Sequence, residues 1–118
     1  MKVEHALAFS ARTHEPPGLE IRVNFGIFAG REATPAEVDE LGRVLLERVD
    51  QVSIISEERH EMAGDSEASL HQVRIEIADA ALPADEHEAD ELRGRLLEVA
   101  ERWAEACIAD RHQDLSDI

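Results

Sequence analysis

The chain has one cysteine, Cys107, no tyrosine, and one lysine against eleven arginines in its 118 residues. A single cysteine excludes an intramolecular disulfide and any Cys-x-x-Cys metal or redox motif. No apolar stretch is long enough to span a membrane, and the first residues lack the charged region and apolar run of a signal peptide. We therefore expect a cytoplasmic protein, and the preference for arginine and alanine suggests a bacterial source with a GC-rich genome.

The charge is strongly one-sided, with a formal net charge of −15. Such a surface repels phosphate backbones and anionic lipid, so we expect neither a nucleic-acid partner nor a membrane partner. The hydrophobic content of 43% is enough for a core, and the aromatic content of 3% means that the core is mostly Leu, Ile, Val and Ala. We expect one domain over residues 1–118, ending in a frayed acidic tail at 113–118.

Residues 19–27 alternate strictly between apolar and other side chains, which predicts a strand with one buried face. The alternation stops at Ala29 and Gly30. The sequence Thr34-Pro35-Ala36-Glu37 then has the pattern of a capping box with proline at the first helical position, so it predicts the start of a helix.

Three further strands and two helices are predicted from the periodicity of the apolar residues. The strands are expected over residues 3–10, 51–62 and 69–78, and the helices over residues 35–49 and 85–111. A turn is expected over residues 63–67, between the third and fourth strands.

The element order ββαββα limits the topology. A right-handed crossover makes the second and third strands parallel, and the fourth strand returns between them. Numbering the strands zero to three in chain order, the predicted sheet is antiparallel with the order 0-1-3-2 and has both helices on one face. This α+β architecture resembles a ferredoxin-like two-layer sandwich, a fold that hosts many unrelated functions.

The third and fourth strands form a predicted hairpin in which His60 lies opposite His71. This register also places Ile54 opposite Ile77 on the inner face and Glu57 opposite Arg74 on the outer face. An opposite-charge pair across two strands stabilises a sheet, whereas a shift of one residue would place Glu57 against an isoleucine.

The histidines suggest a metal site at one end of this sheet. If His60 faces His71, their imidazoles can reach one ion, and either His5 or Glu58 completes the ligand set. First-row transition metals favour imidazole with carboxylate, so the predicted cofactor is a divalent transition metal. In the simpler interpretation, these histidines line a polar rim where the core thins out, and their joint protonation loosens this end at low pH.

The outer sheet face suggests self-association. It is predicted to carry Phe28, Ile55 and Leu70, with Gly26 allowing another surface to approach a central strand closely. We therefore expect a homodimer formed through this face.

The remaining motifs predict little chemistry. Gly30-Arg31 before a helix could bind an anion, but a plain turn and cap is the simpler interpretation. Cys107 lies on the apolar stripe of the last helix, where a buried, inert thiol is expected. The leading functional prediction is a non-catalytic, self-associating module that binds a partner or ligand. The alternative is a metal-binding protein or metal-dependent enzyme that uses the histidines.

Overall fold

The computed structural model describes residues 8–13 and 17–116, with no account of the side chains of Phe28, Glu61, Ala68 and residues 110–116. His5 and the first part of the predicted N-terminal strand lie outside this range. The elements are β1 (Ala8–Arg12), β2 (Leu19–Val23), α2 (Phe25–Ala29), α3 (Pro35–Leu45), β3 (Ser53–Ala63), β4 (Ser66–Ile77), the short 3-10 helix η1 (Asp79–Ala81) and α4 (Glu86–Ser116).

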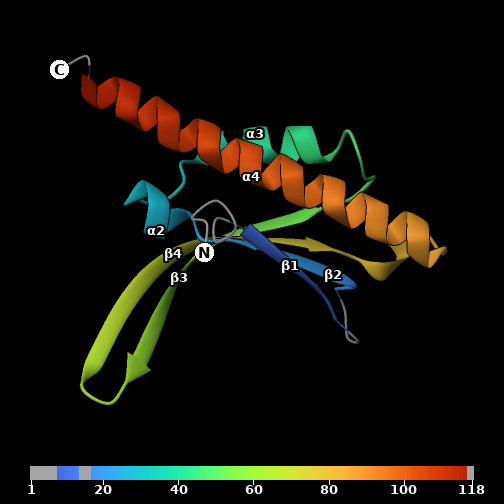
Figure 1. Cartoon of the computed structure of the whole chain (residues 1–118), viewed down its shortest axis with the longest axis horizontal. Helices are drawn as coiled ribbons and strands as arrows, with labels where there is room; N and C mark the ends of the chain where they lie inside the picture. The colour runs from blue at the N-terminus through green and yellow to red at the C-terminus, as the bar shows by residue number, and fades with distance from the viewer. Residues whose placement is uncertain (1–7, 14–16, 117–118) are drawn as a thin grey trace.

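The four strands form one antiparallel sheet in the order β1-β2-β4-β3, which is the neighbour order predicted from the sequence. The protein is therefore an α+β protein. Helices α3 and α4 lie on the same side of the sheet, with α4 running across it (Figure 1). Of the helices in the described range, none is both long enough and apolar enough to cross a membrane.

The core lies between the sheet and these helices. The inward residues of β2, and those of β4 from Val73 to Ile77, are almost completely buried. Phe25 packs against Trp103 with ring centroids 5.4 Å apart. The largest fully buried side chains are Phe25, Leu19, Ile21, Leu41, Leu45, Ile75, Ile77, Leu96, Val23 and Val73. As expected from the composition, most are aliphatic.

The predicted strand over residues 19–27 is too long. The strand ends at Val23, and residues 25–29 form α2, which is closed by Gly30 in the left-handed conformation with its N–H donating to the Gly26 carbonyl at 2.9 Å. Phe25 and Ala29 are buried, whereas Ile27 is 55% exposed. Burial at positions i and i+4 fits a helix. Over only five residues, apolar side chains at 25, 27 and 29 also fit the period of two that is typical of a strand.

In β1 the smaller of two neighbouring apolar side chains faces the core and the larger one faces outward. Ala8 pairs with Val23 and is buried, whereas Phe9 pairs with Arg22 on the outer face and is 44% exposed. The small Ala8 fits beneath α4, which contacts β1, while the larger Phe9 packs against the Arg22 guanidinium. Side-chain size at the core therefore outweighed the hydrophobic alternation.

The β3–β4 hairpin is shifted by two residues from the predicted register. Glu58 lies opposite His71 and His60 lies opposite Ser69. The predicted five-residue turn is in fact a two-residue turn at Gly64 and Asp65, with Gly64 at a φ of 61°, as in a type II′ turn. A shift of two residues keeps every side chain on its predicted face, because the period of a strand is two.

The helix predicted over residues 85–111 is longer in the structure, and the helix predicted over residues 35–49 is shorter. Helix α4 continues from Glu86 to Ser116, so the chain remains helical beyond the expected end at residue 111 and through most of the predicted tail. Helix α3 ends at Leu45, and a turn replaces its predicted last four residues. The capping box at Thr34 and Glu37 is present as predicted, with Pro35 at the first helical position.

Part of the hairpin extends beyond the rest of the sheet, and we call residues 59–70 the arm. Strand β2 pairs with β4 only along residues 73–77. Among the described residues, the five residue pairs of the arm, from Arg59↔Leu70 to Ala63↔Ser66, therefore have no third strand beside them. At 3.3 Å per residue the arm is about 15 Å long. It projects away from α4 (Figure 1) and contributes to the molecular dimensions of 48 × 40 × 28 Å.

Candidate functional site

His60 lies on the arm, surrounded by polar groups. Its Nδ1 is 3.2 Å from Ser69 Oγ and 3.6 Å from a carboxylate oxygen of Glu67, and its Nε2 is 3.7 Å from Glu58 Oε1. The side chains of His60, Glu58 and Glu67 are each about half exposed. A protonated imidazole here would be attracted to two carboxylates, but water screens such exposed pairs strongly.

His71 lies where the arm meets the rest of the molecule. It is half-buried, and α2 passes directly over it: a Cβ placed on Gly26 would lie 2.8 Å from the His71 backbone nitrogen. Gly26 therefore allows a close approach, as predicted, but the approaching surface is this chain's own strand β4. Glu58, not His60, is the cross-strand neighbour of His71, so the direct histidine pairing predicted from the sequence is wrong.

Among the described residues, no three His, Cys, Asp or Glu side chains are grouped so that they could hold a metal ion. Glu58 is adjacent to His60 and His71, since it is 3.7 Å from His60 and opposite His71. The predicted set completed by Glu58 is therefore not grouped as a metal site, and the set completed by His5 includes a residue outside the described range. His112 also has no described side chain, whereas Cys107 is buried on α4.

The outer face of the sheet contains a network of charges centred on Arg74. The Arg74 guanidinium lies 3.3 Å from Glu76, 3.5 Å from Glu57 and 3.6 Å from Glu20. Glu20 also accepts a hydrogen bond from Arg22 Nε at 2.9 Å, and Arg22 lies over the Phe9 ring at 5.6 Å. The charges on this face are nearly balanced, in contrast to those of the whole chain.

Two buried polar atoms on this face have no hydrogen-bond partner in the described structure, namely Gln72 Oε1 and Arg74 Nε. Gln72 is only 6% exposed, although it lies on the face that the helices leave open, and its amide nitrogen donates to Asn24 Oδ1 at 3.1 Å. A buried polar atom without a partner costs free energy. Nothing in the alternation of the sequence distinguishes a buried outer position such as Gln72 from an exposed one.

Apolar side chains accompany this network. Ile55 and Leu70 are half-buried on the outer face, as predicted, and Phe9 joins them. Phe28 does not belong to this strand face, because it lies in α2, and its side chain is outside the description. The predicted interface therefore loses Phe28 and gains Phe9.

The loop before α3 is occupied by a structural ion pair. Arg31 contacts both carboxylate oxygens of Glu37 at 2.7 and 2.8 Å, and its guanidinium lies over the Phe25 ring. These hydrogen bonds from Arg31, with a smaller contribution from the Thr34 backbone N–H, lower the pKa of Glu37 from 4.5 to about 2. Because Glu37 neutralises its charge, Arg31 is part of the turn and helix cap. This favours the simpler interpretation of Gly30-Arg31 over an anion-binding site.

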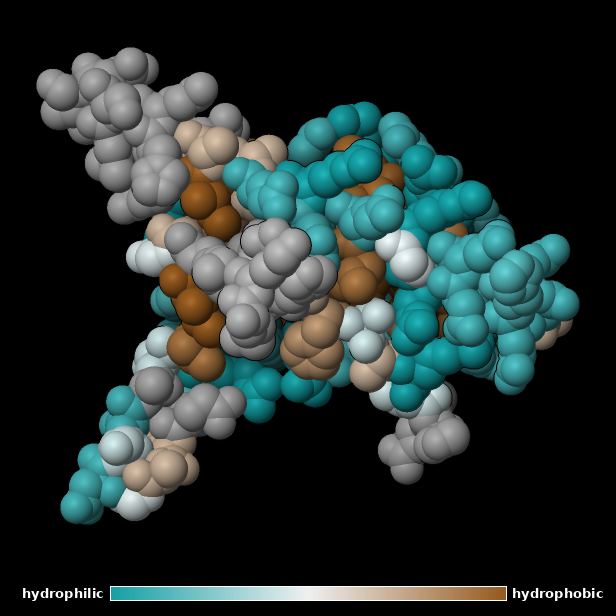
Figure 2. Space-filling model, in the orientation of Figure 1, coloured by the Kyte–Doolittle hydropathy of each residue, from teal (hydrophilic) through white to brown (hydrophobic). Residues whose placement is uncertain are grey.

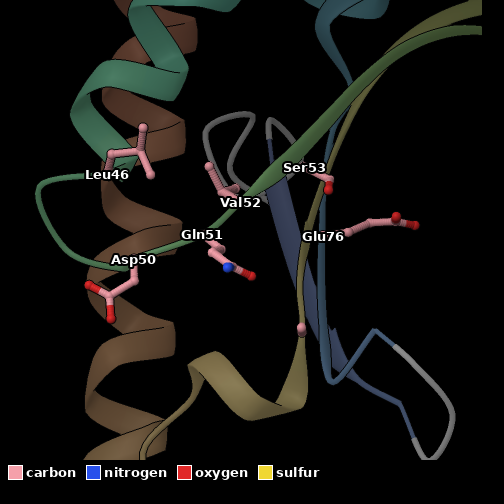
Figure 3. A pocket seen from close by; sticks show the side chains of 7 residues that line it. Leu46, Asp50, Gln51, Val52, Ser53 and Glu76 are labelled. Atoms are coloured by element: carbon pink, nitrogen blue, oxygen red, sulfur yellow. The ribbon is translucent and has the colours of Figure 1, made fainter.

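The hollows lined by described residues include three at other places on the surface. One, of about 410 Å³, lies where the α3–β3 loop meets the sheet and is lined by Leu46, Asp50, Gln51, Val52, Ser53, Glu76 and Ala78 (Figure 3). The second lies between β1 and α4, and the third lies beside Trp103 and Cys107. Neither His60 nor His71 lines any of the three.

The chain matches no known family model, no curated protein and no solved structure.

Proposed function

We propose that this protein is a small non-catalytic binding module that self-associates through the open face of its sheet. In this proposal the fold is a ferredoxin-like two-layer sandwich, with α3 and α4 as one layer and the sheet as the other. The single cysteine and the arginine-rich composition support a bacterial, cytoplasmic setting.

The observation that carries the proposal is the character of the open face. Gln72 Oε1 and Arg74 Nε are buried there without a partner, beside half-buried Ile55 and Leu70. Both atoms are inaccessible in the single chain, so the area that a second protein surface would remove from water is that of the apolar side chains Ile55 and Leu70.

The charge distribution allows that partner to be a second copy. Two chains of net charge −15 repel each other, so a self-complementary interface has to lie where charge is balanced. The network around Arg74 and Arg22 meets this condition, because two cations lie among three carboxylates, those of Glu20, Glu57 and Glu76. A two-fold dimer places the same face on both sides of the contact.

The test is a double substitution on this face, Ile55→Asp with Leu70→Asp. We expect the wild-type protein to be a dimer at micromolar concentration by sedimentation and light scattering, and the double variant to be a monomer. The matched control is Leu46→Asp with Met62→Asp, which makes the same change at side chains that are 53% and 71% exposed and lie off this face. A monomeric wild-type protein, or a control variant that also dissociates, would contradict the proposal.

The alternative function, a metal-binding protein or metal-dependent enzyme, is supported by one arrangement: Glu58 lies beside His60 and opposite His71. Zinc, nickel and cobalt should then bind the wild type more tightly than a His60→Ala, His71→Ala variant. The control is His87→Ala, because His87 is also exposed beside a carboxylate, with Glu91 3.0 Å away on α4. Equal binding by all three proteins would eliminate the metal hypothesis.

A further inference from the structure

Strand β3 forms an edge of the sheet along its whole length. It runs for eleven residues and pairs only with β4, so within the described chain one side of its backbone has no strand partner. Such an edge is a template on which another extended chain can add as a further strand. This surface is distinct from the open sheet face, because a strand pairs at an edge through backbone groups rather than through side chains.

The charge along β3 selects the kind of chain that can add there. On β3, Glu58 presents a carboxylate to solvent, whereas Glu57 already lies 3.5 Å from the Arg74 guanidinium. Glu58 is half exposed, and Glu67 lies near it across the hairpin on the other side of His60. A second copy of β3 would bring a second acidic segment to the same place, whereas a strand containing lysine or arginine would find opposite charges.

A hollow at the start of β3 matches one such cationic side chain. Leu46 and Val52 supply apolar wall, Asp50 supplies an exposed carboxylate, and Ser53 is the first residue of the strand (Figure 3). Glu76 also lines the hollow, but its carboxylate already lies 3.3 Å from Arg74. Figure 3 shows Glu76 coming from the sheet and Asp50 from the loop, on different sides of Ser53. Lysine and arginine cover apolar surface with their methylene groups while the charged end reaches a carboxylate.

We propose that β3 is a docking edge for an extended, basic segment of another protein. The segment adds as a fifth strand beside β3, and one lysine or arginine fills the hollow at Asp50. Neither the backbone pairing nor the hollow depends on whether the protein is a monomer or a dimer, so this inference stands or falls separately from self-association.

The test uses a synthetic peptide of alternating lysine and valine, about nine residues long, which matches the length of a typical edge strand. Its binding is followed by fluorescence anisotropy, and its position by amide hydrogen exchange. We expect slower exchange along Ser53–Ala63 when the peptide is present. A second peptide, N-methylated at alternate residues, keeps every charge but loses backbone donors, and should bind at least about tenfold more weakly.

Two charge-reversal variants locate the contact. Asp50→Lys with Glu58→Lys should weaken binding by at least about tenfold, because it removes opposite charge at the strand. Glu98→Lys with Glu105→Lys makes the same net change at exposed positions on α4 and should weaken binding by less than about threefold. Circular dichroism confirms that each variant is folded.

Three outcomes would overturn the proposal. Equal weakening by both charge variants would mean non-specific attraction to an acidic surface. Equal binding of the two peptides would exclude strand addition. Protection of β3 amides that rises with protein concentration when no peptide is present would assign the edge to a second copy of this chain.

Discussion

Strand β4 passes through two different environments, and the contrast shows what stabilises this protein. Along residues 73–76 it has strands on both sides, and its inward side chains Val73, Ile75 and Ile77 are at most 1% exposed. Along residues 66–70 only β3 lies beside it in the described part of the chain, and the side chains of Ser66, Glu67 and Ser69 are exposed. The same strand is therefore part of the core at one end and a two-stranded ribbon at the other.

The two ends of β4 pair with β3 in the same way, but they differ in how much apolar surface they bury. Both lie in a continuous antiparallel ladder with β3, but an isolated two-stranded ribbon is marginally stable in water. Figure 2 shows the same contrast, with apolar surface gathered beside α2 and mostly hydrophilic or neutral surface on the arm. We infer that the arm opens locally at much lower free energy than the rest of the sheet does.

The largest expected effect comes from removing a core side chain. Ile75→Ala should lower the free energy of unfolding by about 2–5 kcal/mol, because Ile75 is fully buried and its loss leaves a cavity. Met62→Ala on the arm should change it by less than about 0.5 kcal/mol, since Met62 is 71% exposed. Urea unfolding measures both, and a comparable loss in the two variants would show that the arm is packed against something.

This contrast also explains which features the sequence could predict. The strand order follows from handedness and chain connectivity, and the cap of α3 follows from local chemistry at Thr34 and Glu37. The hairpin register was missed by two residues, because a shift of two preserves every face and leaves the hydrophobic pattern unchanged. Only the turn at Gly64 distinguishes the two registers.

The candidate sites were harder to predict than the fold. Placing His60 opposite His71 depended on the register, so the error of two residues separated the proposed ligands. The burial of Gln72 without a partner for Oε1 is not encoded in the periodicity, which gives the face of a residue but not its exposure. The edge of β3 could be read from the topology, since the last strand in the predicted order has one free side.

The second prediction concerns the stability of the protein in acid. Low pH should weaken the ion pair between Arg31 and Glu37 at the start of α3, which belongs to the helix layer rather than to the arm. Because Arg31 lowers the pKa of Glu37 from 4.5 to about 2, the Glu37 carboxylate stabilises the folded protein above pH 4.5. This contribution, roughly 2 kcal/mol after allowance for partial exposure, is lost as the pH falls from 4.5 towards 2. In Glu37→Gln it should be absent at every pH, so the stabilities of the two proteins should converge in acid.

Glu40→Gln is the matched control for this prediction. Glu40 is also paired with an arginine, since Arg43 lies within hydrogen-bonding distance and lowers the pKa of Glu40, but this pair is exposed to water. Chemical denaturation at several pH values should show a much smaller change for Glu40→Gln than for Glu37→Gln. A pH-independent difference between Glu37→Gln and the wild type would contradict the assignment to charge.

The third prediction tests the boundary between the two regions. Gly26→Ala should destabilise the protein by about 1–3 kcal/mol, because the added Cβ would lie 2.8 Å from the backbone nitrogen of His71 and α2 would have to shift. Gly94→Ala is the control, because Gly94 lies in α4 with open space around it, and there alanine should stabilise by up to about 1 kcal/mol. Thermal unfolding of both variants would show opposite signs.

The smallest expected effect is the most informative about the arm. Replacing residues 60–69 with Asn-Gly joins Arg59 to Leu70, which already lie opposite each other, through a two-residue turn suited to a hairpin. Because the removed residues bury little, the free energy of unfolding should change by less than about 1 kcal/mol. The shortened protein keeps Ile55, Leu70 and the network around Arg74, so it should also keep the oligomeric state of the wild type. If it folds but becomes a monomer while the wild type is a dimer, the arm rather than the open face joins the two copies.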